Sequence, residues 1–187
     1  MKRVIHRFRR DLRVSDNTAL SEAARRAEQV IPVFVLRDQL RSGTDDRPPR
    51  LRFLLHSLAA LQKELAELGY PLVIRAGEPS GALVHLSREA GAEAVFANKR
   101  YEPHAEAQDA RVFNALNAAG IGFELFKDAV VWEEQKILTQ TGKPFTVYTP
   151  YSKAWKTRAI PDPRPALRPV RGWKLRLRSD PPPLDTN

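Results

Sequence analysis

The run VIPVFVL, residues 30–36, decides the fold class of this chain. It is short, apolar throughout and rich in β-branched side chains, as expected of a strand buried within a sheet. The next apolar pattern has a helical period and ends at Gly69, where a left-handed helix cap is expected. This helical stripe consists of Leu51, Leu54, Leu55, Leu58, Leu61, Leu65 and Leu68. A buried strand followed by an amphipathic helix predicts an α/β unit.

The same alternation of strand and helix repeats on both sides of this unit. Further strands are expected at residues 4–6, 72–74, 94–96 and 123–126. Further helices are expected over about 19–27 after Ser15 or Asp16 as N-cap, over 79–90 before Gly91, and over about 104–116 before Gly120. Five strands interleaved with four helices predict an α/β fold with a doubly wound, five-stranded parallel sheet of the Rossmann-like type.

In such a sheet, ligands lie beyond the carboxyl ends of the strands, at the point where the strand order reverses. Candidate site residues therefore fall in three loops, 7–15, 37–50 and 98–104. The glycine turns of dinucleotide and P-loop sites do not occur, which disfavours ordinary NAD or ATP binding and a nucleotide hydrolase. The HExxH and GxSxG patterns are also absent, and the four histidines are dispersed. We expect no metal site and no catalytic residues in this chain.

Composition limits the class of protein further. The 187 residues are 42% hydrophobic and 28% charged, which suits one globular domain with a tail. The absence of cysteine excludes disulfides and thiol nucleophiles. No apolar run approaches the roughly 20 residues of a membrane-spanning helix. The charged start MKRVIHRFRRDLR is unlike a secretory signal, so we expect a cytoplasmic protein with no membrane partner.

The net charge of +9 lies mostly in a proline- and arginine-rich tail. Nine Lys or Arg residues and three Asp residues fall in 153–187, so this segment holds +6 and residues 1–152 hold +3. We expect weak, tail-dependent DNA binding, because neutralisation of phosphates by Lys and Arg drives nonspecific association. The expected boundaries are an α/β domain over 1–157 and an extended, linker-like tail over 158–187, anchored at points such as Trp173.

The densest polar signal is the run FRRDLR at residues 8–13. Three arginines and two aspartates lie within residues 8–16, between a strand and a helix. Such a loop is locked by Arg–carboxylate pairs, or it presents guanidinium groups to an anionic ligand. Loop architecture and helix capping are the favoured interpretation for Asp11, Arg13, Asp16 and Asn17.

This segment resembles the opening signature of the DNA photolyase/cryptochrome family, in which an FRRDLR-like loop precedes a DN-x-AL helix start. Three further segments resemble the family in the same order: 33–36, NKRYEP at 98–103 with Asp109, and GKPFTVYTPYSKAW at 142–155. Arg7 is a departure, because the family commonly has an aromatic residue near this position. The resemblance implies a two-domain flavoprotein whose N-terminal α/β domain binds a light-harvesting antenna chromophore and whose helical C-terminal domain binds FAD.

The resemblance also implies a reaction. In photolyases the antenna passes excitation energy to reduced FAD, which donates an electron to a pyrimidine dimer flipped out of DNA; cryptochromes use similar machinery in signalling. The helical FAD-binding domain is not found within 1–187, so FAD is expected only in that missing domain. We therefore expect an N-terminal fragment of a deoxyribodipyrimidine photo-lyase, a carbon–carbon lyase, or of a cryptochrome, inactive alone, with DNA a partner of the parent protein. The alternative is a stand-alone Rossmann-like ligand-binding or protein-interaction module derived from a photolyase.

Mapped onto the three loops, the resemblance implies one antenna-binding cleft. Its expected residues are Phe8, Arg9, Arg10, Leu36, Arg50, Phe53, Asn98, Arg100 and Glu102. Apolar walls suit a flat conjugated ring, and arginines suit an anionic tail. Leu36 and Phe53 are equally well interpreted as core residues, and Arg50 as a solvated residue at a helix start. Folate-binding members often have a glutamate where this chain has Ala105. A deazaflavin or flavin mononucleotide (FMN) is therefore favoured over methenyltetrahydrofolate, unless the site is empty.

Overall fold

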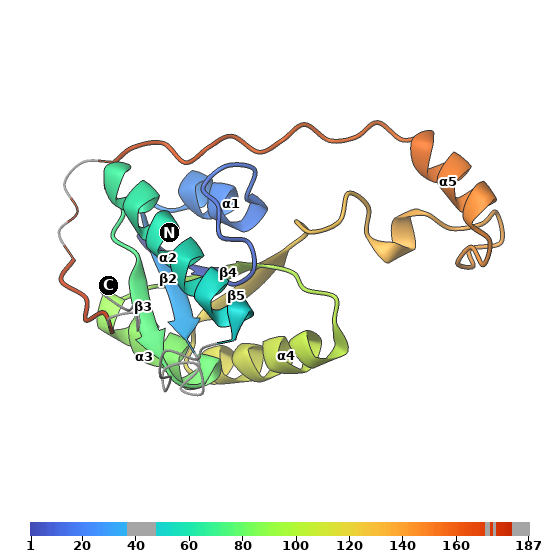
Figure 1. Cartoon of the computed structure of the whole chain (residues 1–187). Helices are drawn as coiled ribbons and strands as arrows, with labels where there is room; N and C mark the ends of the chain where they lie inside the picture. The colour runs from blue at the N-terminus through green and yellow to red at the C-terminus, as the bar shows by residue number, and fades with distance from the viewer. Residues whose placement is uncertain (37–47, 171–172, 174, 181–187) are drawn as a thin grey trace.

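Five parallel strands form the centre of the molecule (Figure 1). The computed structural model describes residues 1–36, 48–170, 173 and 175–180, so most of the second predicted loop, 37–47, lies outside the described residues. The strands are β1 Arg3–Phe8, β2 Gln29–Leu36, β3 Val73–Ala76, β4 Ala94–Asn98 and β5 Gly122–Phe126. Their order, β3-β2-β1-β4-β5, makes β1 and β4 neighbours. The predicted doubly wound, five-stranded parallel sheet is confirmed, and its order reverses between β1 and β4.

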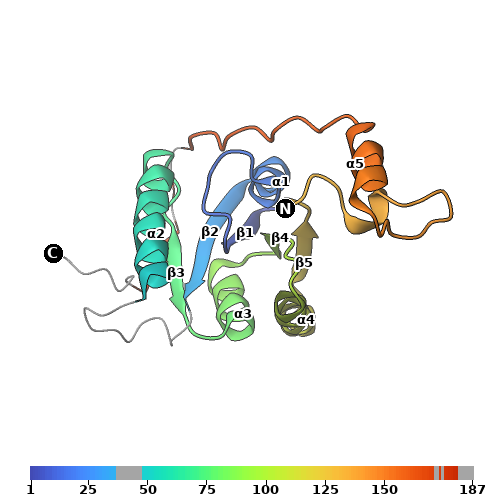
Figure 2. The same ribbon diagram turned by 45° about the vertical axis from the view of Figure 1, so that its right-hand side comes forward.

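Two pairs of helices cover the two faces of this sheet (Figure 2). Helices α1 Thr18–Arg26 and α2 Pro49–Glu67 cover one face, and α3 Pro79–Ala90 and α4 Pro103–Ala118 cover the other. Successive strand side chains point to opposite faces. Phe8 therefore packs in the core under α1 and α2, whereas Ile5 packs in the core under α3 and α4. Among the described residues, no helix has the length and hydropathy needed to cross a bilayer.

The ends of the helices follow from a few polar and glycine residues. Asn17 is the N-cap of α1 and accepts a hydrogen bond from the backbone N–H of Leu20 at 3.1 Å. The N-cap predicted at Ser15 or Asp16 is therefore wrong by one or two positions. Gly69 and Gly91 adopt the left-handed conformation after α2 and α3, with φ of 85° and 61°, as their positions predict.

Residues 127–157 leave the sheet as an arm that stands away from the body (Figure 1). The arm contains η2 Glu134–Lys136 and α5 Tyr148–Lys156. No residue of α5 is buried, and the side chains of Val147 and Tyr148 are exposed. The sequence pattern does not predict α5, because a short helix that buries no apolar stripe gives no periodic signal.

The described part of the tail is extended and lies along the body (Figure 1). The backbone N–H of Leu167 donates to the carbonyl of Val14 at 3.0 Å, and that of Val170 donates to the carbonyl of Leu68 at 2.8 Å. Leu167 is buried in the core under α1 and α2. Trp173, the expected anchor, packs against the cores on both faces.

The last described residues of the tail cover the outer edge of β3. The Ser179 hydroxyl accepts from the backbone N–H of Ile74 at 2.9 Å, and the carbonyl of Ile74 accepts from the N–H of Asp180 at 2.9 Å. A carboxylate oxygen of Asp180 accepts from the N–H of Ala76 at 2.9 Å. Ser179 and Asp180, called the edge cap below, thus satisfy backbone groups that the end of a sheet leaves without a strand partner.

Candidate functional site

A groove of about 540 Å³ opens at the carboxyl ends of β1 and β4. Its lining residues are Arg9, Arg10, Asp11, Arg13, Asn98, Lys99, Arg100, Tyr101, Glu102, Asp128 and Ala129. The groove lies at the reversal of strand order, where doubly wound sheets bind their ligands. Its volume falls within the range of roughly 300–1,000 Å³ that is common for small-molecule sites.

Hydrogen bonds around Asn98 join the loop after β1 to the end of β4. The Asn98 amide donates to Asp11 Oδ2 at 2.6 Å and to Asn17 Oδ1 at 2.8 Å, and its Oδ1 accepts from the N–H of Ala19 at 2.8 Å. Asp11 Oδ1 accepts from the backbone N–H of Arg9 at 2.7 Å. Asp11 and Asn17 thus have the architectural role that the sequence favours for them, and they fix the rim of the groove.

Two pairs of arginines each share one carboxylate at this site. Asp109 Oδ1, on α4, lies 2.6 Å from Arg9 Nη1 and 3.8 Å from Arg7 Nη1. Arg9 also donates to the backbone carbonyl of Asn98. At the rim, Glu102 Oε1 lies 2.6 Å from Arg10 Nη1 and 3.3 Å from Arg100 Nη2.

These two groups differ in their contact with solvent. The side chains of Arg7, Arg9 and Asp109 are at most 7% exposed, whereas that of Arg10 is 72% exposed. The hydrogen bond from Arg100 lowers the pKa of Glu102, which keeps this carboxylate charged. Of the first group, Arg9 lines the groove, and Arg7 and Asp109 lie buried behind it. The second group forms a solvated rim.

The remaining polar groups of the groove are held from the arm and from the end of β5. Arg13 Nη2 lies 2.8 Å from Asp128 Oδ2, and Asp128 Oδ1 accepts from the N–H of Thr18 at 3.0 Å. Glu133 accepts from the Tyr101 hydroxyl at 2.9 Å and lies 3.1 Å from Lys99 Nζ. Burial and the hydrogen bond to Glu133 raise the pKa of Tyr101, so the phenol stays protonated.

The side chains that line this groove are suited to binding a ligand. Five basic and three acidic side chains line it, together with the Tyr101 ring. Guanidinium groups recognise anionic oxygen atoms, and an aromatic wall accommodates a flat ring. Among the residues that the structure describes, no three His, Asp or Glu side chains lie close enough to hold a metal ion. The arrangement favours a planar, anionic ligand.

Comparison with known proteins identifies the family. The family model described as DNA photolyase matches residues 4–169. The chain belongs to the DNA photolyase family. A deoxyribodipyrimidine photo-lyase from a Synechococcus strain is 35% identical over 162 residues, which are 87% of this chain and 33% of that protein. The photo-lyase from Halobacterium salinarum is also 35% identical, over 87% of this chain and 35% of its own length.

Solved structures show the same likeness for this photolyase-family chain. A bacterial class III photolyase from Agrobacterium tumefaciens superposes with a TM-score of 0.79 at 32% identity, over 97% of this chain and 37% of the other. A Synechocystis cryptochrome has a TM-score of 0.77 at 19% identity, over 97% and 40% of the two chains, which shows a shared fold. The chain therefore spans about a third of the length of these relatives.

The structure brings five of the nine predicted site residues together. The five that line the groove are Arg9, Arg10, Asn98, Arg100 and Glu102. Phe8 and Leu36 lie in the core under α1 and α2, each 1% exposed, as the alternative interpretation of Leu36 predicts. Arg50 and Phe53 are exposed in the first turns of α2 and do not line this groove. The alternative interpretation of Phe53 as a core residue is therefore wrong, and that of Arg50 as a solvated residue is confirmed. A ligand contact for these four stays a prediction.

Several groove residues were not predicted from the sequence. Lys99 and Tyr101 lie inside the NKRYEP segment, which the loop prediction already covered. Arg13 lines the groove as well as bracing its loop. Asp128 follows β5 by two residues, and its position at a carboxyl end is the signal that could have identified it.

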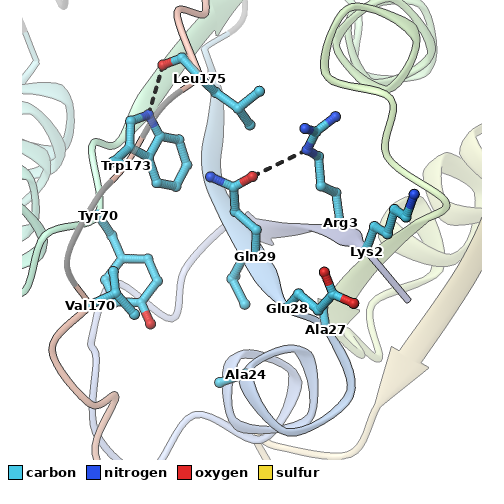
Figure 3. A pocket seen from close by; sticks show the side chains of 11 residues that line it. Lys2, Arg3, Ala24, Ala27, Glu28, Gln29, Tyr70, Val170, Trp173 and Leu175 are labelled. Carbon is cyan, nitrogen blue, oxygen red and sulfur yellow. Dashed lines mark hydrogen bonds between the residues drawn. The ribbon is translucent and has the colours of Figure 1, made fainter.

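A second cavity, of about 620 Å³, lies at the opposite, amino end of the sheet (Figure 3). Tyr70 and three tail residues, Val170, Trp173 and Leu175, form part of its wall. Arg3 is already engaged there by the side chain of Gln29 and the carbonyl of Ala90. This cavity is mainly a consequence of how the tail packs against the body.

Proposed function

We propose that this chain is the antenna-chromophore-binding domain of a light-dependent photolyase or cryptochrome. The observation that carries the proposal is the groove at the carboxyl ends of β1 and β4, in which five residues chosen from the sequence converge. The groove offers fixed cationic groups, an aromatic wall and a suitable volume, and no arrangement of nucleophile and base among its lining residues. It holds a ligand in place, which is the task of an antenna domain.

A deazaflavin or FMN is the proposed ligand, in preference to methenyltetrahydrofolate. Both flavin-like rings are planar, and the excess of basic groups suits an acidic ring or a phosphate. Ala105, at the position where folate-binding relatives often have a glutamate, is a buried residue of α4. A Sulfolobus tokodaii photolyase with 23% identity and a TM-score of 0.75 is described as containing two FAD molecules, which suggests a novel light-harvesting cofactor in that protein.

The proposed partner is an FAD-binding domain, and the arm supports it. Phe145 and Tyr151 pack at 6.1 Å between ring centroids, beside the exposed side chains of Val147 and Tyr148. Val147, Tyr148 and Ile160 are large apolar side chains that the body of the domain leaves exposed. DNA is proposed as a partner of the parent protein, with weak binding through the basic tail in this chain.

The experiment is a titration of the purified chain with FMN, a deazaflavin and methenyltetrahydrofolate. We expect a flavin or deazaflavin to bind at one equivalent, and Arg10→Glu to weaken it by about 1–3 kcal/mol, the range for a charge-assisted hydrogen bond. The control is Arg88→Glu, an exposed site on α3 outside the groove. Stoichiometric FAD together with light-dependent dimer repair by this chain would overturn the proposal.

A stand-alone module derived from a photolyase is the second candidate, and the edge cap favours it. With Ser179 and Asp180 in place, the outer edge of β3 needs no further strand. Expressed alone, such a module unfolds in one cooperative step and does not associate with a separately expressed FAD-binding domain of a relative. Tight association with that domain would support the first candidate.

A further inference from the structure

The buried charged group behind the groove holds more positive charge than its one carboxylate neutralises. Arg7 and Arg9 are both buried, and Asp109 is the acidic group paired with them. The pairing is uneven, because Arg9 makes the close contact and Arg7 stays at 3.8 Å, donating to Gln108 Oε1 at 3.3 Å. Within the described chain, Nε and Nη1 of Arg7 and Oδ2 of Asp109 have no hydrogen-bond partner although they are buried.

Arg7 faces this site because of its place in β1. It follows Ile5 by two residues and therefore points to the α3 and α4 face, toward Gln108 and Asp109 on α4. Burial, followed by the positive charge of Arg9, lowers the pKa of Arg7 to about 10, and Arg100 adds to this effect. Arg7 is still protonated at neutral pH, and its charge acts on the same region as Arg9 and Arg100.

The rim repeats the pattern, since Arg10 and Arg100 share Glu102. The two groups together hold four guanidinium charges and two carboxylates. A buried charge without a full partner is costly, and an anion that binds beside it removes part of that cost. Arg13 and Lys99 are paired with Asp128 and Glu133, and Asp11 offsets part of the remaining charge, so a net positive charge is left at the site. This charge favours a phosphate monoester, which carries about −1.5 to −2 at pH 7.

We infer that Arg7 and the two shared carboxylates make the groove select a chromophore that bears a phosphate monoester, such as FMN, over the same ring without phosphate. The inference rests on the proposed chromophore-binding function and goes further, because it names the charge of the ligand and a residue behind the groove that sets it. Arg7 does not contact the ring of the ligand. It acts as a positioning residue, because its positive charge adds to the charges of Arg9 and Arg100 at the place where the phosphate binds.

The test compares FMN with riboflavin, which has the same ring and no phosphate, by flavin fluorescence. We expect the wild-type chain to bind FMN at least about tenfold more tightly than riboflavin. Arg7→Met leaves Arg9 and Asp109 as a balanced pair, so it should reduce the preference for FMN by about tenfold. The affinity for riboflavin should stay within about twofold of the wild type, and the melting temperature should not fall. Arg10→Gln should cut the preference in the same direction.

Arg75→Met is the matched control. Arg75 is also a buried arginine on a strand and faces the same side of the sheet, but it pairs with Glu89 away from the groove. This change should lower the melting temperature and leave the preference for FMN unchanged. Equal binding of FMN and riboflavin to the wild type, or an unchanged preference in Arg7→Met, overturns the inference alone. Failure of FMN, riboflavin, deazaflavin and methenyltetrahydrofolate to bind overturns the proposed function with it.

Discussion

The side-chain amide of Asn98 and the carboxylate of Asp11 are joined by a hydrogen bond of 2.6 Å. The bond connects the end of β4 with the loop after β1, two segments that are 87 residues apart in the chain. A flip of the Asn98 amide would break a hydrogen bond, because the amide oxygen already accepts from the N–H of Ala19. The rim of the groove therefore depends on an acceptor at position 11.

Asp11→Ala should lower stability by about 1–3 kcal/mol, because the N–H of Arg9 and the amide of Asn98 both lose their acceptor. For a chain of this size that is a fall of about 2–4 °C in melting temperature per kcal/mol. Asp11→Asn should have an intermediate effect, since one oxygen is kept and the other acceptor becomes a donor. Calorimetry on the three proteins checks this order, and equal melting temperatures would contradict it.

Most of the layer structure could be predicted from local pattern. Strand and helix periods, with the caps at Gly69 and Gly91, are properties of neighbouring residues. The groove was predicted from topology, because carboxyl ends of neighbouring parallel strands meet. The sequence could not show that Phe8 and Leu36 lie in the core and not in the groove, since their orientation depends on which face of the sheet α1 and α2 cover. Apart from the anchor at Trp173, the contacts of the tail were not predicted, because they join residues that are far apart in sequence.

The acid sensitivity of the fold should depend on His6. His6 is fully buried, and its two ring nitrogens have no partner among the described residues. Burial lowers the pKa of His6 to about 4, against a weaker opposing effect of Asp11 and Asp128. In the unfolded chain, His6 takes up a proton near pH 6.5. The contribution of neutral His6 to the free energy of unfolding is therefore fully present above that pH and is lost as the pH falls toward 4. The loss reaches up to about 3 kcal/mol.

Melting curves between pH 7.5 and 4.5 measure this effect. His6→Leu should remove the part of the pH dependence between about 6.5 and 4, because the native and unfolded states then no longer differ at that position. His85→Gln is the matched control, since the His85 side chain is 77% exposed. The same slope in wild type and His6→Leu would show that other groups cause the acid sensitivity.

Weak DNA binding should depend on the exposed arginines of the tail. Truncation is a poor test, because Leu167 is a core residue and the edge cap covers β3. The better variant replaces exposed tail arginines by glutamine: Arg164, Arg168, Arg176 and Arg178. Each phosphate contact that is lost should reduce the salt slope by about 0.9. The matched control replaces four exposed arginines of the body: Arg25, Arg52, Arg88 and Arg111.

Affinity for a DNA duplex, measured at several salt concentrations, separates the two sets. The tail variant should bind more weakly with a shallower slope, and the body variant should bind like the wild type. Equal losses in both variants would place the DNA-binding surface on the body of the domain.

The edge cap should hold β3 against local opening. Asp180→Ala removes the acceptor of the Ala76 N–H, while the backbone N–H of residue 180 can still donate to the carbonyl of Ile74. A bond between a charged acceptor and a backbone N–H is worth about 1.5–3 kcal/mol, and partial access of water at this edge of the sheet brings the expected loss near 1 kcal/mol. Because amide exchange reports local opening, the Ala76 amide should exchange about five to ten times faster.

Asp162→Ala is the control for this change, since Asp162 is an exposed carboxylate of the same tail. It should leave exchange at Ala76 as it is. The amides of β1 should keep their protection in both variants, because β1 is bonded to β2 and β4 and opens only with the whole sheet. Unchanged exchange at Ala76 in Asp180→Ala would mean that the tail leaves β3 in solution. Faster exchange throughout β1 would mean that the edge cap instead supports the global stability of the domain.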